Sequence, residues 1–138
     1  MDETNGLAYR FGERVDIPTE TDARVIDAAT AHLLESNFPY TRSVLALRSP
    51  VVGVVVDGAV VSACYCARTR PNVCEAGVDT IEPYRGRGLA ALVVSAWRDA
   101  VETEGCEPLY STSWDNLASR AVAAKLRLIP YAETLSLR

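Results

Sequence analysis

The sequence predicts a single domain with a mixed α/β fold, and three observations support this. The chain has 138 residues, enough to bury one hydrophobic core and too few for two. Hydrophobic residues make up 49% and charged residues 23%, a balance that indicates a globular chain. Segments with strand periodicity and segments with helix periodicity follow one another without a linker or repeat, so we expect one domain over residues 1–138.

The first part of the chain is predicted to hold one strand and two helices. Residues 7–11 (LAYRF) are typical of a short strand. A helix of about 15 residues is predicted to open at Pro18-Thr19, where Thr19 and Asp22 have the spacing of a capping box. Its apolar positions recur with helical period: Val25, Ile26, Ala29, Leu33 and Leu34. A second short helix is predicted over residues 41–48 (TRSVLALR).

The rest of the chain alternates between strands and helices. The β-rich runs VVGVVV and AVVSACYCA meet at Asp57-Gly58, which favours a two-residue hairpin turn, and a third strand is predicted at residues 73–80. A helix over GLAALVVSAWRDAVETEG should end at Gly105, followed by the strand PLYSTS. The helix WDNLASRAVAAKLRL, with Asp115 as N-cap, and the strand YAETLSL complete the order β-α-α-β-β-β-α-β-α-β.

Charge and composition exclude several classes of partner. The net charge of −4, with Arg85 and Arg87 as the only close basic cluster, argues against nucleic acid. The acidic N-terminus lacks a secretory pattern and no apolar segment reaches the ~20 residues of a membrane span, so we expect a cytoplasmic protein without membrane contact. Cys64 and Cys66 have no second pair of ligands nearby, so no metal site is expected. His32 has no neighbouring nucleophile, which favours a structural histidine over a catalytic one.

The stretch YRGRGLAALVV, residues 84–94, places two arginines and two glycines directly before a predicted helix. Unpaired N–H groups at a helix start attract anions and glycines allow close approach, so a phosphate is the expected ligand. A P-loop is excluded because the Gly-Lys-Ser/Thr element is missing. GRGLAA fits the dinucleotide fingerprint G-x-G-x-x-A, with Glu104 and Glu107 at about the required distance, but three successive strands precede it in place of a β-α-β unit.

Two longer motifs carry a resemblance to a known family. VDTIEPYRGRGLA resembles the signature of the GNAT superfamily of acetyl-CoA-dependent N-acyltransferases, whose pyrophosphate loop reads Arg/Gln-x-x-Gly-x-Gly/Ala. LYSTSWDNLASRAVAAKLRL resembles its second motif, a strand followed by an Asn-led helix, and the match spans residues 73–138. The resemblance implies a mostly antiparallel central sheet flanked by helices. It also implies transfer of an acetyl group from acetyl-CoA to an amine of a small molecule or peptide, by direct general-base-assisted attack.

The resemblance also implies a cofactor site. Main-chain groups of the strand before the loop would pair with the pantetheine arm, and loop N–H groups would hold the pyrophosphate, with both arginine side chains free to add charge. Asn116 matches an asparagine that contacts the cofactor, although a capping role beside Asp115 is the alternative. The implied residues are Val78, Thr80, Arg85, Gly86, Arg87, Gly88, Leu89, Ala90 and Asn116.

The catalytic residues are less clearly marked. Glu75 is the first candidate for the base and Asp79, on the same face of the strand, the reserve, unless both are solvated carboxylates. The main-chain N–H of Val78 would stabilise the oxyanion. The general acid in the family is a tyrosine seven residues after the asparagine, where this chain has Ala123. Ser119, Tyr110 or Tyr131 could replace it, or a thiol of pKa near ~8.5 could leave unaided.

Some properties stay open at this point. The missing tyrosine favours an alternative in which the domain binds acyl-CoA without turning it over, as a sensor or interaction module, and a third interpretation treats the glycine-rich turn as purely structural. Arg127 also stands where the family has a glycine. The acidic composition leans towards a cationic acceptor amine. A homodimer is also left open.

Overall fold

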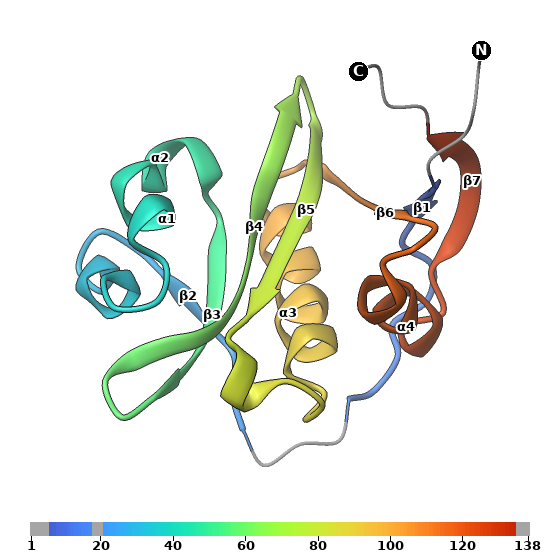
Figure 1. The fold of residues 1–138 in the computed structure, drawn as a ribbon. Coiled ribbons are helices and arrows are strands. Elements are labelled where there is room, and N and C mark those ends of the chain that lie inside the picture. The colour runs from blue at the N-terminus through green and yellow to red at the C-terminus, as the bar shows by residue number, and fades with distance from the viewer. Residues whose placement is uncertain (1–5, 18–20, 135–138) are drawn as a thin grey trace.

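The computed structural model describes residues 6–17 and 21–134, which form one sheet with helices on both faces (Figure 1). The strands have the order β2-β3-β4-β5-β6-β1-β7, and every pair is antiparallel except β5 with β6. The strands are β1 (Gly6–Arg10), β2 (Arg24–Ile26), β3 (Val51–Val56), β4 (Ala59–Arg70), β5 (Val73–Thr80), β6 (Glu107–Ser113) and β7 (Ile129–Thr134). The helices are η1 (Ala31–Leu34), α1 (Pro39–Ser43), α2 (Leu45–Arg48), η2 (Glu82–Tyr84), α3 (Leu89–Thr103) and α4 (Leu117–Lys125). The mixed, mostly antiparallel sheet predicted from the sequence is confirmed.

Two hydrophobic clusters cover the two faces of the sheet. The larger joins α3 and α4 to the central strands and has fully buried Trp97 and nearly fully buried Tyr110 at its centre. The smaller packs η1, Phe38 and the α2 residue Leu45 against β3 and β4, with Leu34 fully buried. β4 and β5 are therefore buried on one face by α3 and lie beside the short N-terminal helices on the other (Figure 1).

The predicted turns and caps in the middle of the chain are confirmed. Asp57 and Gly58 have φ angles of 51° and 78°, the left-handed conformation that a two-residue hairpin turn requires. Helix α3 ends as expected at Gly105, whose φ is 80°. The N–H of Gly105 donates to Glu102 O and that of Cys106 to Val101 O, the pair of bonds of a Schellman cap.

The helix predicted to open at Pro18-Thr19 is wrong. Residues 24–26 form the strand β2, paired with β3, and only Ala31–Leu34 are helical, as a 3₁₀ turn. Pairing with β3 makes residues 24–26 a strand, and Asp27 then turns the chain, because its Oδ1 accepts the N–H groups of Ala29 and Thr30 at 3.0 and 3.1 Å. Such local bonds favour a turn over a helix. Thr19, the predicted cap, lies outside the described residues.

The predicted helix over residues 41–48 is also divided. It consists of α1 and α2, which are separated at Val44, where φ is −120° and the helical backbone is interrupted. Two short helices at an angle cover β3 and β4 where the sequence predicted one (Figure 1).

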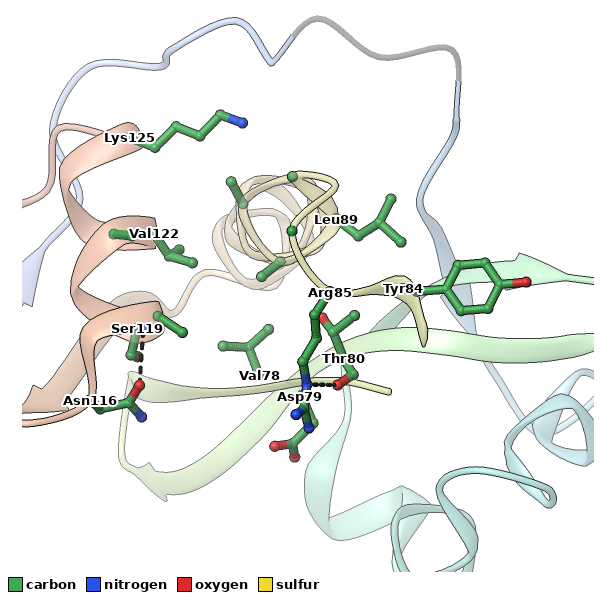
Figure 2. Close-up of a pocket in the computed structure, with 16 residues that line it drawn as sticks. Val78, Asp79, Thr80, Tyr84, Arg85, Leu89, Asn116, Ser119, Val122 and Lys125 are labelled. Atoms are coloured by element: carbon green, nitrogen blue, oxygen red, sulfur yellow. Dashed lines mark hydrogen bonds between the residues drawn. The ribbon is translucent and has the colours of Figure 1, made fainter. Parts of the chain in front are cut away.

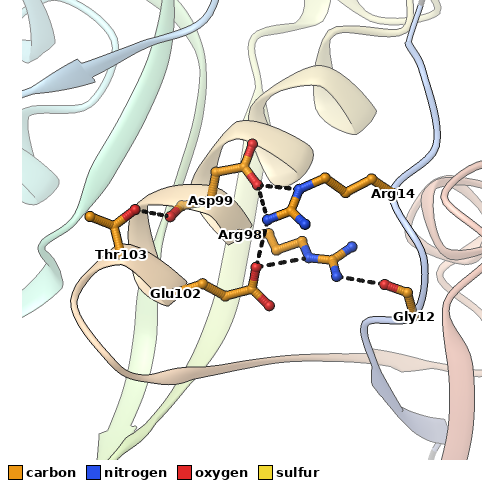
Figure 3. A network of polar contacts seen from close by, with 6 residues as sticks. All are labelled: Gly12, Arg14, Arg98, Asp99, Glu102 and Thr103. Carbon is orange, nitrogen blue, oxygen red and sulfur yellow. Dashed lines mark hydrogen bonds and ion pairs between the residues drawn. The ribbon is translucent and has the colours of Figure 1, made fainter.

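A polar network holds the crossover between β1 and β2 against the outer face of α3, as Figure 3 shows. Arg14 contacts Asp99 and Glu102, both at 2.8 Å, and Arg98 Nη2 donates to Gly12 O at 2.5 Å. The ion pairs are exposed to solvent, so each contributes little to stability. Their effect is to fix the path of this segment across α3, away from the loop at the helix start.

The parallel pair β5 and β6 separates shortly after it begins. The two strands are paired only from Val73 with Glu107 to Glu75 with Leu109. Beyond Glu75 the second half of β5 has no neighbour on that side, and the gap is flanked by α3, which follows β5, and α4, which follows β6 (Figure 1). This division of the sheet creates the space for a ligand.

Candidate active site

The glycine-rich turn forms an open helix start. Gly86 and Gly88 both have φ of 78°, and Gly88 is the residue that caps α3. The first hydrogen bond of the helix is donated by the N–H of Leu92 to Gly88 O, so the N–H groups of the preceding residues have no helical partner. The first turn contains no acidic side chain. These groups and the helix dipole together favour an anion at this point.

A pocket of about 490 Å³ lies between this helix start, the end of β5 and helix α4 (Figure 2). It contains most of the cofactor-binding residues predicted from the sequence: Val78, Thr80, Arg85, Gly86, Gly88, Leu89, Ala90 and Asn116. It also contains Asp79 and Ser119, two of the three catalytic candidates, but neither Arg87 nor Glu75. The structure thus brings together segments that lie up to about 45 residues apart in sequence, a pairing that parallel strands with a helical crossover permit.

The hydrogen-bond pattern of β5 leaves main-chain groups free in this pocket. Ile81 donates its N–H to Val61 O, and residues of an antiparallel pair alternate between bonded and non-bonded positions. Asp79 is therefore in a bonded position with Ala63, whereas Val78 and Thr80 direct their N–H and C=O groups away from β4. Because β6 has already diverged, no strand takes up these groups. A peptide-like ligand such as a pantetheine arm has the amides to bind them.

The two loop arginines are not free, contrary to the expectation. Arg85 Nε donates to Thr80 O at 2.8 Å, which turns the side chain back over the end of β5 (Figure 2). Arg87 Nη2 donates to Pro83 O at 3.2 Å and its guanidinium lies 4.9 Å from the centre of the Tyr84 ring. Both side chains are bonded to nearby main-chain oxygens, one at the end of β5 and one in the turn that follows it. Their positive charge stays near the pocket, but their geometry supports the loop.

Lys125 is a cation of this pocket that the sequence did not single out. It lies in the last turn of α4 and lines the pocket, and its Nζ would be 2.9 Å from a Cβ placed on Gly88. The ammonium group therefore lies close to Gly88 at the helix start. The sequence signal that could have identified Lys125 was its position at the end of the helix that begins at Asn116, because this helix runs from β6 back towards the glycine-rich loop.

Asn116 is the N-cap of α4, so the capping alternative is confirmed for this residue and the expectation for Asp115 is wrong. Its Oδ1 accepts the N–H of Ser119 at 3.0 Å. Asp115 lies one residue before the cap and carries no such bond within the described residues. Since the cap uses only the oxygen of the amide, the side-chain nitrogen of Asn116 remains a donor at the edge of the pocket.

Ser119 is linked to a buried tyrosine. The Tyr110 hydroxyl lies 2.6 Å from Ser119 Oγ and 3.1 Å from Ser119 O. Burial raises the pKa of Tyr110 to about 12, so this phenol is protonated at any ordinary pH. Ala123, at the position of the family's tyrosine, is buried and does not line the pocket, while Tyr131 is 52% exposed on β7. Of the alternatives for a proton donor, the structure brings Ser119 and Tyr110 together.

The two candidate bases share one face of β5 but differ in their surroundings. Cys74 and Ala76 are buried towards α3, so Glu75 and Asp79 face the other side, as strand alternation predicted. Glu75 Oε1 accepts a hydrogen bond from Ser111 Oγ at 2.5 Å, across the point where β5 and β6 separate. Asp79 Oδ2 accepts one from the Tyr65 hydroxyl at 2.7 Å and belongs to the pocket.

The cysteines do not offer a nucleophile or a metal site. Cys64, Cys66 and Cys74 are buried, and burial raises the pKa of Cys66 to about 12 and that of Cys64 well above its ordinary value. Within the part of the chain that the structure describes, no cluster of His, Cys, Asp or Glu side chains could hold a metal ion. The same described residues contain no helix that is long and apolar enough to cross a membrane.

Comparison with known proteins identifies the family. A family model described as GNAT acetyltransferase matches residues 15–129. A search of curated proteins found no match. The structure is similar to an acetyltransferase of the GNAT family from Colwellia psychrerythraea (TM-score 0.73, 14% identity, covering 96% of this chain and 55% of that one). It is also similar to a GCN5-related N-acetyltransferase-like protein from Streptococcus suis 89/1591 (TM-score 0.71, 21% identity, 98% and 60% of the two chains).

A third similar structure is AAC(6')-Iy in complex with the bisubstrate analogue CoA-S-monomethyl-acetylneamine (TM-score 0.64, 15% identity, 87% of this chain and 98% of that one). At these identities the likeness concerns the fold, and this chain spans less than two thirds of the first two structures. The family match covers most of the chain, and the fold agrees with it. The protein therefore belongs to the GNAT acetyltransferase family.

Proposed function

We propose that this protein is an N-acetyltransferase that moves an acetyl group from acetyl-CoA to an amine of a small molecule or peptide, acting as a single domain. One observation carries the proposal. The main-chain N–H and C=O of Val78 and the N–H of Thr80, which β4 does not bind, lie in the same pocket as the open start of α3, and together they suit a pantetheine arm and a pyrophosphate. The activated acyl group of the bound thioester supplies the chemistry.

We propose Asp79 as the general base. An ammonium group has no free electron pair, so the acceptor must lose a proton before or during its attack on the acyl carbon. Asp79 lines the pocket, between Val78 and Thr80 in the strand. Glu75 is bonded to Ser111 and does not line the pocket. The proton passes from the amine nitrogen to the Asp79 carboxylate, directly or through water. The N–H of Val78 is proposed to donate to the oxyanion that forms.

We propose Ser119 as the group that returns a proton to the departing sulfur, with Tyr110 as its positioning residue. Ser119 lines the pocket, and its Oγ is hydrogen-bonded at 2.6 Å to the hydroxyl of buried Tyr110. As the bond between the acyl carbon and sulfur breaks, the thiolate takes the proton of the Ser119 hydroxyl while Ser119 takes one from solvent, to which the Asp79 carboxyl releases the proton of the amine. Because thiols leave readily, with a pKa near ~8.5, the rate contribution of Ser119 should be small.

Release of free CoA over an amine panel, followed chromatographically, tests the proposal. Asp79→Asn keeps an acceptor for the Tyr65 hydroxyl and should lower kcat by roughly 10²–10⁴-fold without changing the KM for acetyl-CoA. Glu75→Gln is the matched control on the same strand face and should retain most activity. A larger loss in Glu75→Gln than in Asp79→Asn would transfer the base role to Glu75.

A second candidate function is a non-catalytic acyl-CoA-binding module. The observation in its favour is Ala123, which is buried where the family resemblance implies a tyrosine acid. Tight binding of acetyl-CoA without turnover on any amine, unchanged in Asp79→Asn, would support this module and exclude the enzyme.

A further inference from the structure

Arg48, the last residue of α2, is held in a fixed position beside the sheet. Its guanidinium carbon lies 4.2 Å from the centre of the Tyr65 ring and 5.0 Å from the centre of the Tyr40 ring. Its Nη1 donates to Thr41 Oγ1 at 2.9 Å, and Thr41 is buried. Stacking on two rings and one hydrogen bond orient the planar guanidinium before any ligand arrives.

The Tyr65 ring connects this cation to the proposed base. Gly77 makes room for the ring, because a Cβ at Gly77 would be only 2.5 Å from Cε2 of Tyr65. The ring is 8% exposed and its hydroxyl donates to Asp79 Oδ2 at 2.7 Å. One phenol ring therefore separates the Arg48 guanidinium from the Asp79 carboxylate, on the face of β5 that α3 does not cover.

Arg48 lacks an internal counter-ion. Among the residues that the structure describes, it forms no ion pair with a carboxylate, whereas Arg42 on the neighbouring helix pairs with Glu35 at 2.9 Å. A partly buried cation without a partner is unfavourable, and an anionic ligand group would relieve it. The guanidinium fork presents paired N–H groups that match a carboxylate in two parallel hydrogen bonds.

We propose that Arg48 binds a carboxylate of the acceptor, so that the acceptor is a small amine that also carries a carboxylate, such as an amino acid. This inference rests on the proposed N-acetyltransferase function. The acceptor would lie beside the Tyr65 hydroxyl, with its amine at Asp79 and its carboxylate at the Arg48 guanidinium.

The test compares acids with their uncharged amides. The probes are the standard amino acids and the α-carboxamide of each, with release of CoA as the readout. For the best acceptors, the acid should exceed its amide in kcat/KM by roughly tenfold or more, since one charge-assisted pair is at stake. Arg48→Gln should lower kcat/KM for the acid by about the same factor and leave the amide within roughly twofold.

Two further variants control for charge and for folding. Arg42→Gln removes the same charge from the adjacent helix and should change neither substrate, which separates a specific contact from a long-range effect. Arg48→Lys keeps the charge without the planar fork and should fall between the parent and Arg48→Gln. Melting curves establish that each variant is folded.

The inference is overturned if amides react as well as acids, if Arg48→Gln lowers both equally, or if the parent consumes no compound of the panel. Calorimetric titration of the same samples with acetyl-CoA distinguishes a failure of the Arg48 inference from a failure of the proposed N-acetyltransferase function. A parent that binds acetyl-CoA but shows no preference for carboxylates contradicts only the role of Arg48. A folded parent that binds no acetyl-CoA removes the proposed function and this inference with it.

Discussion

Replacing Gly88 by valine should abolish acetyl-CoA binding and leave the protein folded. Gly88 has φ of 78° at the start of α3, where an L-residue costs about 1–2 kcal/mol. The nearest atom to a new Cβ is Lys125 Nζ at 2.9 Å, the end of a flexible side chain that can move away. The fold should therefore survive, while the branched side chain fills the space where a phosphate would meet the helix N–H groups.

The expected loss of affinity follows from the bonds that the side chain blocks. Two charge-assisted hydrogen bonds to main-chain N–H groups amount to about 3 kcal/mol or more, which is a loss of more than roughly 100-fold. Isothermal titration with acetyl-CoA measures it. The strain itself should lower the melting temperature by roughly 3–8 °C for a chain of this length.

Gly58→Val provides the matched control. Gly58 has the same φ of 78°, has no atom within 4 Å of the place where a Cβ would stand, and lies in the hairpin turn between β3 and β4. It should lose a similar amount of stability and bind acetyl-CoA like the parent. If Gly88→Val also binds within about threefold of the parent, the glycine-rich loop does not hold the phosphate and the proposed cofactor site is refuted.

Three further substitutions test other parts of the structure. Lys125→Gln should weaken acetyl-CoA binding about tenfold in calorimetry at low salt, and less at high salt, because it removes the cation that lies close to the helix start. Arg127→Gly should raise the free energy of unfolding by about 1 kcal/mol in urea titrations, since Arg127 has φ of 53° in the cap of α4. Tyr110→Phe should reduce the loss of stability between pH 10 and 12. The folded-state pKa of Tyr110, about 12, lies above that of the unfolded chain, so its contribution is complete below pH ~10 and is lost as the pH rises, by on the order of 2 kcal/mol. An unchanged alkaline melting profile would contradict the burial of this phenol.

The segments predicted correctly were those whose structure depends on neighbouring residues. The Asp57-Gly58 turn and the Gly105 cap both need left-handed backbone, which glycine adopts without strain, so their sequence signals were direct. Gly86 and Gly88 of the glycine-rich loop are left-handed for the same reason and line the pocket, whereas Arg87 does not. Alternation on β5 correctly separated the face of Glu75 and Asp79 from the face covered by α3.

The errors arose where distant partners determine the outcome. Val25 and Ile26 have helical spacing with later leucines, but pairing with β3 makes them a strand, and the sequence contains no local sign of that partner. The bonds of Arg85 and Arg87 to Thr80 O and Pro83 O join residues only five and four positions apart, but they form only because the turn folds back on itself, which the residue types do not reveal. Lys125 reaches the pocket only because α4 crosses back to the loop, a contact far apart in sequence.

The proton donor also depends on contacts between distant residues. The sequence showed that Ala123 replaces the tyrosine of the family, but not that Tyr110 and Ser119 lie together. Residues of β6 alternate, so Tyr110 is buried towards α4 while Ser111 faces the opposite side and bonds to Glu75. One strand thus holds the proposed proton donor through Tyr110 and, on its other face, holds Glu75 outside the pocket. A shift of one residue along β6 would exchange these directions and place a serine under α4 and a tyrosine beside Glu75. The antiparallel pairing of β6 with β1, in which Tyr9 lies opposite Tyr110, holds this register, so β1 helps to keep the Tyr110 hydroxyl at Ser119.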